Sequence, residues 1–152
     1  MIFYVSFECF HVFGKREIAE LCILDEEGHI RCHGTLETKH NFSLLPDHER
    51  RIYRFLIFNY HYILWNEGFI TSSALELFNQ HIPFNSQVMC KGLENKRLIQ
   101  SIRPDLTVLD LDTNVKKIDK IYKTCYMHFS ETFNCALNKN LHLFNSVNNK
   151  DL

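Results

Sequence analysis

The first part of the chain alternates between apolar runs and short polar breaks. Residues 2–13 (IFYVSFECFHVF) are apolar at most positions, which predicts a strand covered on both faces. The polar segment GKRE separates this run from a second one at 18–24, and the turn-forming segment DEEG precedes a third at 29–36. The pattern therefore predicts a three-stranded antiparallel meander.

Helical spacing replaces the strand pattern after residue 46. A helix is predicted over 46–64, because Pro and acidic residues open it and the segment WNEG ends it. Its apolar positions are Ile52, Phe55, Leu56 and Tyr60. A shorter helix is predicted over 71–82, where Ser and Thr precede the helical pattern and Pro83 stops it.

The last part of the chain predicts further alternation of strands and helices. Strands are expected at 86–92 and 106–112, and helices at 93–102, 114–123 and 136–147. A meander followed by α/β units is the element order of the ribonuclease H-like fold, which many DEDD-type exonucleases share. We therefore expect an α/β protein with a mixed sheet, formed by one domain over 1–146 with a tail at 147–152. Element order alone assigns no chemistry.

Composition narrows the function classes. A chain of 152 residues with 45% hydrophobic and 23% charged residues is typical of one globular domain. Its net charge of −1 means that any contact with nucleic acid must use a local basic patch. The opening residues lack the basic region of a signal peptide, and no apolar run is long enough to span a bilayer. We expect an intracellular protein, cytoplasmic or nuclear or both, with no membrane contact and with reduced thiols.

The carboxylates do not follow the pattern of a two-metal nuclease. Nucleases on this fold hold two divalent ions with acidic side chains, the first pair being D-x-E on the opening strand. Here the tripeptide is Ser6-Phe7-Glu8, and the last helix carries no acid. Asp110 and Asp112 end the last strand and are rim residues more often than ligands. No catalytic residue is assigned, and Glu8 needs a partner if it is ionised inside an apolar strand.

A candidate metal motif lies near the end of the chain. Cys125, His128 and Cys135 have the spacing C-x2-H-x6-C. A structural zinc site needs four donors, so either His142 or a residue from elsewhere in the fold must supply the fourth. Glu20 stands inside the second apolar strand and is a candidate. The alternative is that the spacing is accidental and that the thiols are buried, as predicted for Cys9, Cys22, Cys32 and Cys90.

Three segments resemble the Maelstrom domain, a ribonuclease H-like module of Piwi-interacting-RNA silencing. They are IAELCILDEEGHIRCHGTL (18–36), VMCKGLENKRLIQ (88–100) and CYMHFSETFNCAL (125–137). The resemblance extends over about residues 2–145 and indicates a divergent or stand-alone relative. It implies a structural Zn²⁺ held by Glu20, Cys125, His128 and Cys135. It also implies single-stranded RNA and silencing-pathway proteins as partners, or a role in mobile-element or viral biology.

Basic residues gather in three places along the chain. They are Arg50, Arg51 and Arg54; Lys91, Lys96 and Arg97; and Lys116, Lys117, Lys120 and Lys123. Each set alone is more often a solvated helix face. The middle set opens a helix after a strand, where backbone amides also favour phosphate, so it is the first candidate for RNA and the arginine set is the second. Tyr60, Tyr62 and Trp65 are candidates for base stacking, although a Trp is more often in the core.

Three functions from different classes remain. The first is a zinc-stabilised RNA-binding module, the second is an active endoribonuclease for single-stranded RNA, and the third is a protein–protein adaptor that keeps only the scaffold. The first is favoured because the acids are depleted while the Glu-Cys-His-Cys set is complete.

Overall fold

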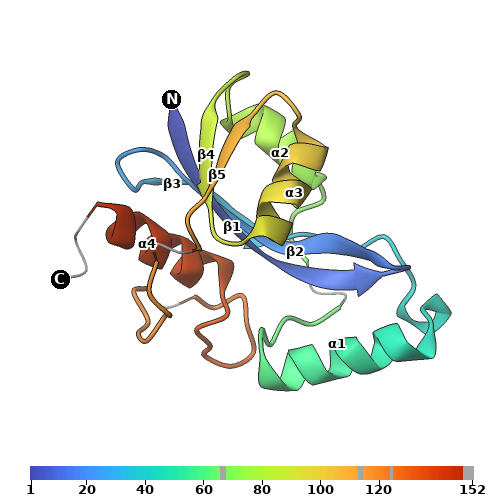
Figure 1. The fold of residues 1–152 in the computed structure, drawn as a ribbon. Helices are drawn as coiled ribbons and strands as arrows, with labels where there is room; N and C mark the ends of the chain where they lie inside the picture. Colours follow the sequence, from blue (N-terminus) through green and yellow to red (C-terminus); the bar gives the residue numbers. More distant parts are fainter. Residues whose placement is uncertain (66–67, 113–114, 124, 149–152) are drawn as a thin grey trace.

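The computed structural model describes residues 1–65, 68–112, 115–123 and 125–148. Five strands form one mixed sheet in the order β3-β2-β1-β4-β5 (Figure 1). They are β1 (Ile2–Val12), β2 (Lys15–Leu24), β3 (Ile30–Thr35), β4 (Gln87–Cys90) and β5 (Thr107–Asp110). Strands β1, β2 and β3 pair antiparallel, whereas β4 runs parallel to both β1 and β5. The predicted meander and the α/β class are confirmed.

Helices cover both faces of this sheet. A 3-10 turn, η1 (Phe42–Leu44), precedes the helices α1 (Asp47–Asn59), α2 (Ala74–His81), α3 (Leu93–Ile102) and α4 (Ala136–Val147). The core on one face contains residues of α2 and α3, and α4 packs on the other face (Figure 1). None of the helices in the described part of the chain is long and apolar enough to cross a membrane. The end of α4 at Val147 lies one residue beyond the expected domain boundary, and residues 149–152 of the expected tail are outside the described part.

Strand β1 is the centre of the sheet and is buried on both sides, as its sequence predicts. Phe3, Val5 and Phe7 belong to the core beneath α2 and α3. Tyr4 points to the opposite face, where it packs edge-on against Phe144 of α4. The alternation of side chains along β1 therefore divides the protein into two apolar layers.

The pairing of β1 with β2 contains a bulge beside a buried carboxylate. Glu8 pairs with Glu20, but the next residue of β1, Cys9, pairs with Ile18. Ala19 is thus the extra residue in β2. Bulges change the direction of neighbouring side chains and are frequent near functional sites.

Helix α1 is shorter than the sequence predicts and buries a different face. It ends at Asn59 instead of continuing to 64, and the backbone at Tyr62 has a positive φ of 52°. Its buried residues are Glu49 and Ile57, while Phe55, expected on the inner face, is 62% exposed. The reason for the different face is a tertiary contact that apolar spacing does not report.

That contact joins α1 to the β1–β2 hairpin. Phe13 and Gly14 form the tip, both with positive φ, and their N–H groups donate to the two carboxylate oxygens of Glu49 over 2.6 Å each. Glu49 must therefore face the sheet, which rotates Phe55 outwards.

The helix predicted over 114–123 is wrong. Residues 115–123 are not helical, and residue 114 lies outside the described part. Side chains of α4 bond this segment's backbone instead. Asn138 accepts from the N–H of Tyr122 over 2.7 Å and donates to the carbonyl of Lys120 over 3.0 Å, and His142 lies 2.7 Å from the carbonyl of Lys116. These bonds compete with the helical hydrogen-bond pattern.

Asn140 attaches α4 to the middle of the sheet, and its replacement tests this packing. Its amide donates to the carbonyls of Tyr4 and Cys22 and accepts from the hydroxyl of Ser6. Because Asn140→Ala removes three buried hydrogen bonds, we expect the free energy of unfolding to fall by about 2–4 kcal/mol. Urea denaturation measures this change.

The matched control is Asn145→Ala on the same helix. Asn145 forms no side-chain hydrogen bond within the described residues, so its replacement should cost about 0.5 kcal/mol or less. Equal losses in the two variants would contradict the role given to Asn140.

Candidate metal centre

Glu20 is a fully buried carboxylate in the middle of β2, with 0% exposure. It pairs with Thr35 in β3 and with Glu8 in β1. Two carboxylates directly opposite each other in a sheet repel, and removing either from water adds to the cost. Each therefore needs its own positive partner or hydrogen-bond donors.

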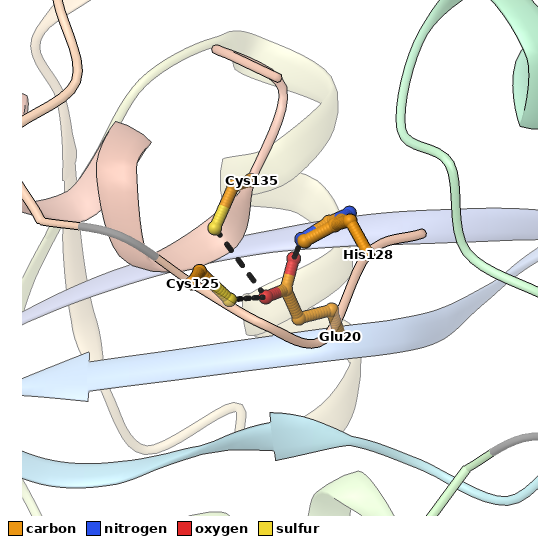
Figure 2. A group of neighbouring side chains, drawn as sticks. All are labelled: Glu20, Cys125, His128 and Cys135. Carbon is orange, nitrogen blue, oxygen red and sulfur yellow. Dashed lines mark hydrogen bonds and ion pairs between the residues drawn. The ribbon is translucent and has the colours of Figure 1, made fainter. Parts of the chain in front are cut away.

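Four potential metal ligands converge at Glu20. Cys125 and His128 lie in the loop before α4, and Cys135 is the residue at the start of α4 (Figure 2). The ligand atoms of these three residues and of Glu20 lie within 4.8 Å of one another. The two sulfur atoms are 3.7 and 3.6 Å from Glu20 Oε2, and His128 Nε2 is 3.1 Å from Oε1. The four residues singled out in the sequence thus form one cluster that could hold a metal ion.

The ring of His128 is oriented as a ligand. Its Nδ1 hydrogen-bonds the backbone carbonyl of His61, which places Nε2 towards the cluster. Nε2 is buried and has no hydrogen-bond partner within the described residues, although Glu20 is near. A histidine that donates Nδ1–H to a carbonyl and directs Nε2 at other potential ligands has the arrangement of a metal ligand.

Glu20 also caps helix α4. The N–H of Ala136, in the first turn, donates to Glu20 Oε1 over 2.7 Å, while the N-cap residue Cys135 makes no side-chain capping bond. A carboxylate is favourable there because the N-terminus of a helix carries partial positive charge. One side chain therefore serves the cluster and the start of the helix.

A fifth residue, His33, completes the surroundings. Its Nε2 is 2.8 Å from Glu20 Oε2 and 3.8 Å from the sulfur of Cys125. Sequence reasoning missed His33. The available signal was alternation in β3: Thr35 pairs with Glu20, so His33, two residues away, faces the same side. Outer-shell partners of this kind fix the ligands of metal sites.

Without metal, the cluster contains ionised acidic groups next to a protonated imidazole. Burial raises the pKa of Glu20, but the neighbouring imidazoles of His128 and His33 outweigh it and bring that pKa to about 2. The hydrogen bond with Cys135 lowers the pKa of Cys125 to about 3, although burial opposes it. Burial lowers the pKa of His128, but Cys125 and Glu20 raise it to about 10, and the pKa of Cys135 is raised. A metal ion must therefore displace protons from this cluster.

The donor set has the composition of a closed structural site. Two thiolates, one imidazole nitrogen and one carboxylate oxygen supply four donors and leave no need for His142. His142 is buried elsewhere, with Nδ1 2.8 Å from the hydroxyl of Tyr122. The remaining cysteines, Cys9, Cys22, Cys32 and Cys90, are buried and unpaired as predicted.

Two of the three acids considered for a nuclease centre, Glu8 and Asp110, have other partners. Glu8 lies 2.7 Å from the ammonium of Lys139 in α4, which is the partner that a buried carboxylate requires. Asp110 accepts hydrogen bonds from the N–H groups of Gly92 and Asp112.

The residues predicted to bind RNA are spread over separate surfaces. In the arginine set of α1, Arg50 is ion-paired with Asp47, and Arg54 lies over the ring of Phe42. Lys91 directly follows β4 and lines a cleft, whereas Lys96 and Arg97 lie on α3. The first amide of the α3 region, Gly92 N–H, is taken by Asp110, so it is not open to phosphate.

The residues predicted to stack on RNA bases also lie in different environments. Trp65 is buried, stacks on Phe10 and donates to the carbonyl of His40, so it belongs to the core. Tyr60 is exposed, and Tyr62 packs edge-on against Phe129.

Comparison with known proteins adds no identification. The chain matches no protein family model, and no curated protein or solved structure matches it significantly.

Proposed function

We propose that this chain is a zinc-stabilised module for binding single-stranded RNA, on a ribonuclease H-like fold of the Maelstrom type. The convergence of Glu20, Cys125, His128 and Cys135 carries the proposal, because 105 residues separate Glu20 from the nearest of the other three. The resemblance of three segments to the Maelstrom domain supports a role in small-RNA silencing or in mobile-element or viral biology.

The sheet supports the fold assignment. A three-stranded antiparallel meander adjoins two parallel strands, and the first strand is central in the order β3-β2-β1-β4-β5. This agrees with the ribonuclease H-like arrangement that the element order predicts.

The donor chemistry favours zinc. Thiolate and imidazole ligands suit Zn²⁺, and four protein donors leave no open position for substrate or water. Glu20 of β2, Cys125 and His128 of the loop and Cys135 at the start of α4 would hold the ion, which would supply positive charge and link these segments. The chain's own residues orient the ligands: the carbonyl of His61 fixes His128, and His33 holds Glu20.

Two observations favour RNA binding without two-metal catalysis. Lys139 engages Glu8 and backbone amides engage Asp110, so two of the three acids considered as ligands of divalent ions already have partners. Lys91, Lys96 and Arg97 form no ion pair within the described residues and remain candidates for phosphate, with Arg50, Arg51 and Arg54 as the competing set.

Removal of one thiolate tests the zinc site. We expect Cys125→Ser and Cys135→Ser to lose stoichiometric zinc and to melt about 10 °C or more below the wild type, because a structural metal supplies folding energy. Elemental analysis and thermal denaturation measure the two effects. Cys32→Ala, outside the cluster, should keep its zinc. Wild-type protein that is purified without zinc, and that melts like the two serine variants, would refute the site.

A second variant tests the outer partner of Glu20. His33→Ala should retain zinc but bind it about 10- to 100-fold more weakly, because Glu20 and Cys125 lose the group that positions them. Competition with a chromophoric chelator measures this affinity. The control His29→Ala changes an exposed histidine near the same hairpin. If His33→Ala loses no affinity, His33 is not a positioning residue.

The RNA proposal has its own test. Wild-type protein should bind single-stranded RNA at low salt and lose affinity steeply as salt rises, because a nearly neutral chain binds phosphate through a few local cations. It should show no magnesium- or manganese-dependent digestion of the RNA. Fluorescence anisotropy and gel assays measure both. Cleavage that requires these ions and disappears in Glu8→Gln would favour the nuclease alternative, and absence of binding would favour the adaptor.

A further inference from the structure

A cleft of about 570 Å³ opens beside α4, between the end of β4 and the segment at 115–118. Its volume is in the range of small-ligand sites. The lining combines cations from three segments of the chain with aromatic rings. The cations are Lys91, Lys117 and Lys139, and the rings are Tyr60 and Phe133.

The floor of the cleft is an ammonium group held in a fixed position. Lys139 Nζ lies 2.7 Å from Glu8 Oε1 and donates to the carbonyl of Phe7 over 3.0 Å. An ammonium has three N–H donors, so one remains after these two contacts. The Lys139 side chain is 23% exposed and lines the cleft, whereas Glu8 beneath it is nearly covered. The cleft therefore meets the positive end of this pair.

Lys91 and Lys117 add charge at the rim. Neither forms an ion pair within the described residues, and the acid that shares the lining is Asp112. Three ammonium groups thus outnumber Asp112 and the buried Glu8 together. A cleft with this charge attracts an anion, and a fixed ammonium at its base can donate to a phosphate oxygen.

The aromatic rings favour an anion that also carries a base, such as a nucleotide of a single strand. Tyr60 is 40% and Phe133 44% exposed, so ring surface is open at the margin of the cleft. Unpaired bases stack on exposed rings while their phosphates contact cations, which is the usual combination in single-strand binding. Lys96 and Arg97 on α3 are not part of the lining that contains these rings. The backbone N–H of Gly92, which precedes α3, is already bonded to Asp110.

Resting on the proposed RNA-binding function, we propose that this cleft is the RNA site and that Lys139 contacts a backbone phosphate at its floor. The nucleotides next to this phosphate stack on Tyr60 and Phe133. Lys91 belongs to the site, while Lys96, Arg97 and the α1 arginines lie outside it.

Anisotropy titration of the full chain with a labelled 12-nucleotide oligouridylate tests this placement. Glu8→Gln/Lys139→Met removes the ammonium without leaving its buried partner charged. We expect this double variant to bind about tenfold more weakly and to lose about one unit of salt slope. Its zinc content and melting temperature verify that it is folded.

Pairs of basic residues outside the Glu8–Lys139 ion pair decide the outcome even if that variant does not fold. Lys91→Ala/Lys117→Ala should weaken binding more than Lys96→Ala/Arg97→Ala, which removes the same charge from α3. The control Lys15→Ala/Lys39→Ala, with the same charge change away from the cleft, should bind like the wild type. A larger loss from the α3 pair, or normal binding by a folded Glu8→Gln/Lys139→Met, overturns the cleft proposal while RNA binding stands. A wild type that does not bind RNA at low salt instead overturns the proposed function.

Discussion

The buried carboxylate of Glu20 is the constraint on which this side of the sheet depends. It lies in β2 without exposure to solvent, opposite a second buried carboxylate, Glu8. An ionised group in that position is unstable unless donors and positive charge surround it. The neighbouring structure provides them: the imidazoles of His33 and His128 and the first amide of α4 all contact Glu20.

The inner face of α4 is consequently more polar than that of an ordinary core helix. Asn138, Asn140 and His142 are buried along with Leu137 and Phe144, and Lys139 reaches Glu8. Apolar side chains tolerate small shifts of a helix, but hydrogen bonds and ion pairs fix one position. The polar face thus determines where α4 sits, and through α4 it determines where Cys135 meets Glu20.

Sequence periodicity was sufficient to predict the elements in which the apolar pattern is clear. The three strands of the meander and the helix at 136–147 were predicted within a few residues, because alternation or helical spacing is clear in each. The face that α1 buries and the conformation of 115–123 were not, because Glu49 and Asn138 bond distant backbone and override local preference.

The candidate site also combines residues that the local sequence reveals with residues that only distant contacts bring in. The motif of Cys125, His128 and Cys135 is local and visible in the sequence, and the resemblance supplied Glu20. His33 and Lys139 could not be found in this way. His33 reaches the cluster only through the register of β3 with β2, and Lys139 meets Glu8 only after α4 has docked on the sheet.

The order of these residues along the chain has a consequence for folding. Glu20 belongs to a hairpin whose strands are adjacent in sequence, whereas Cys125 and Cys135 follow it by 105 and 115 residues. Local hairpins form early, and contacts across such long loops form late. We therefore expect an intermediate in which the sheet is assembled while Glu8 and Glu20 still face water. Docking of α4 then removes both acids from water in one late step, and until that step the unfinished sheet keeps an apolar face open.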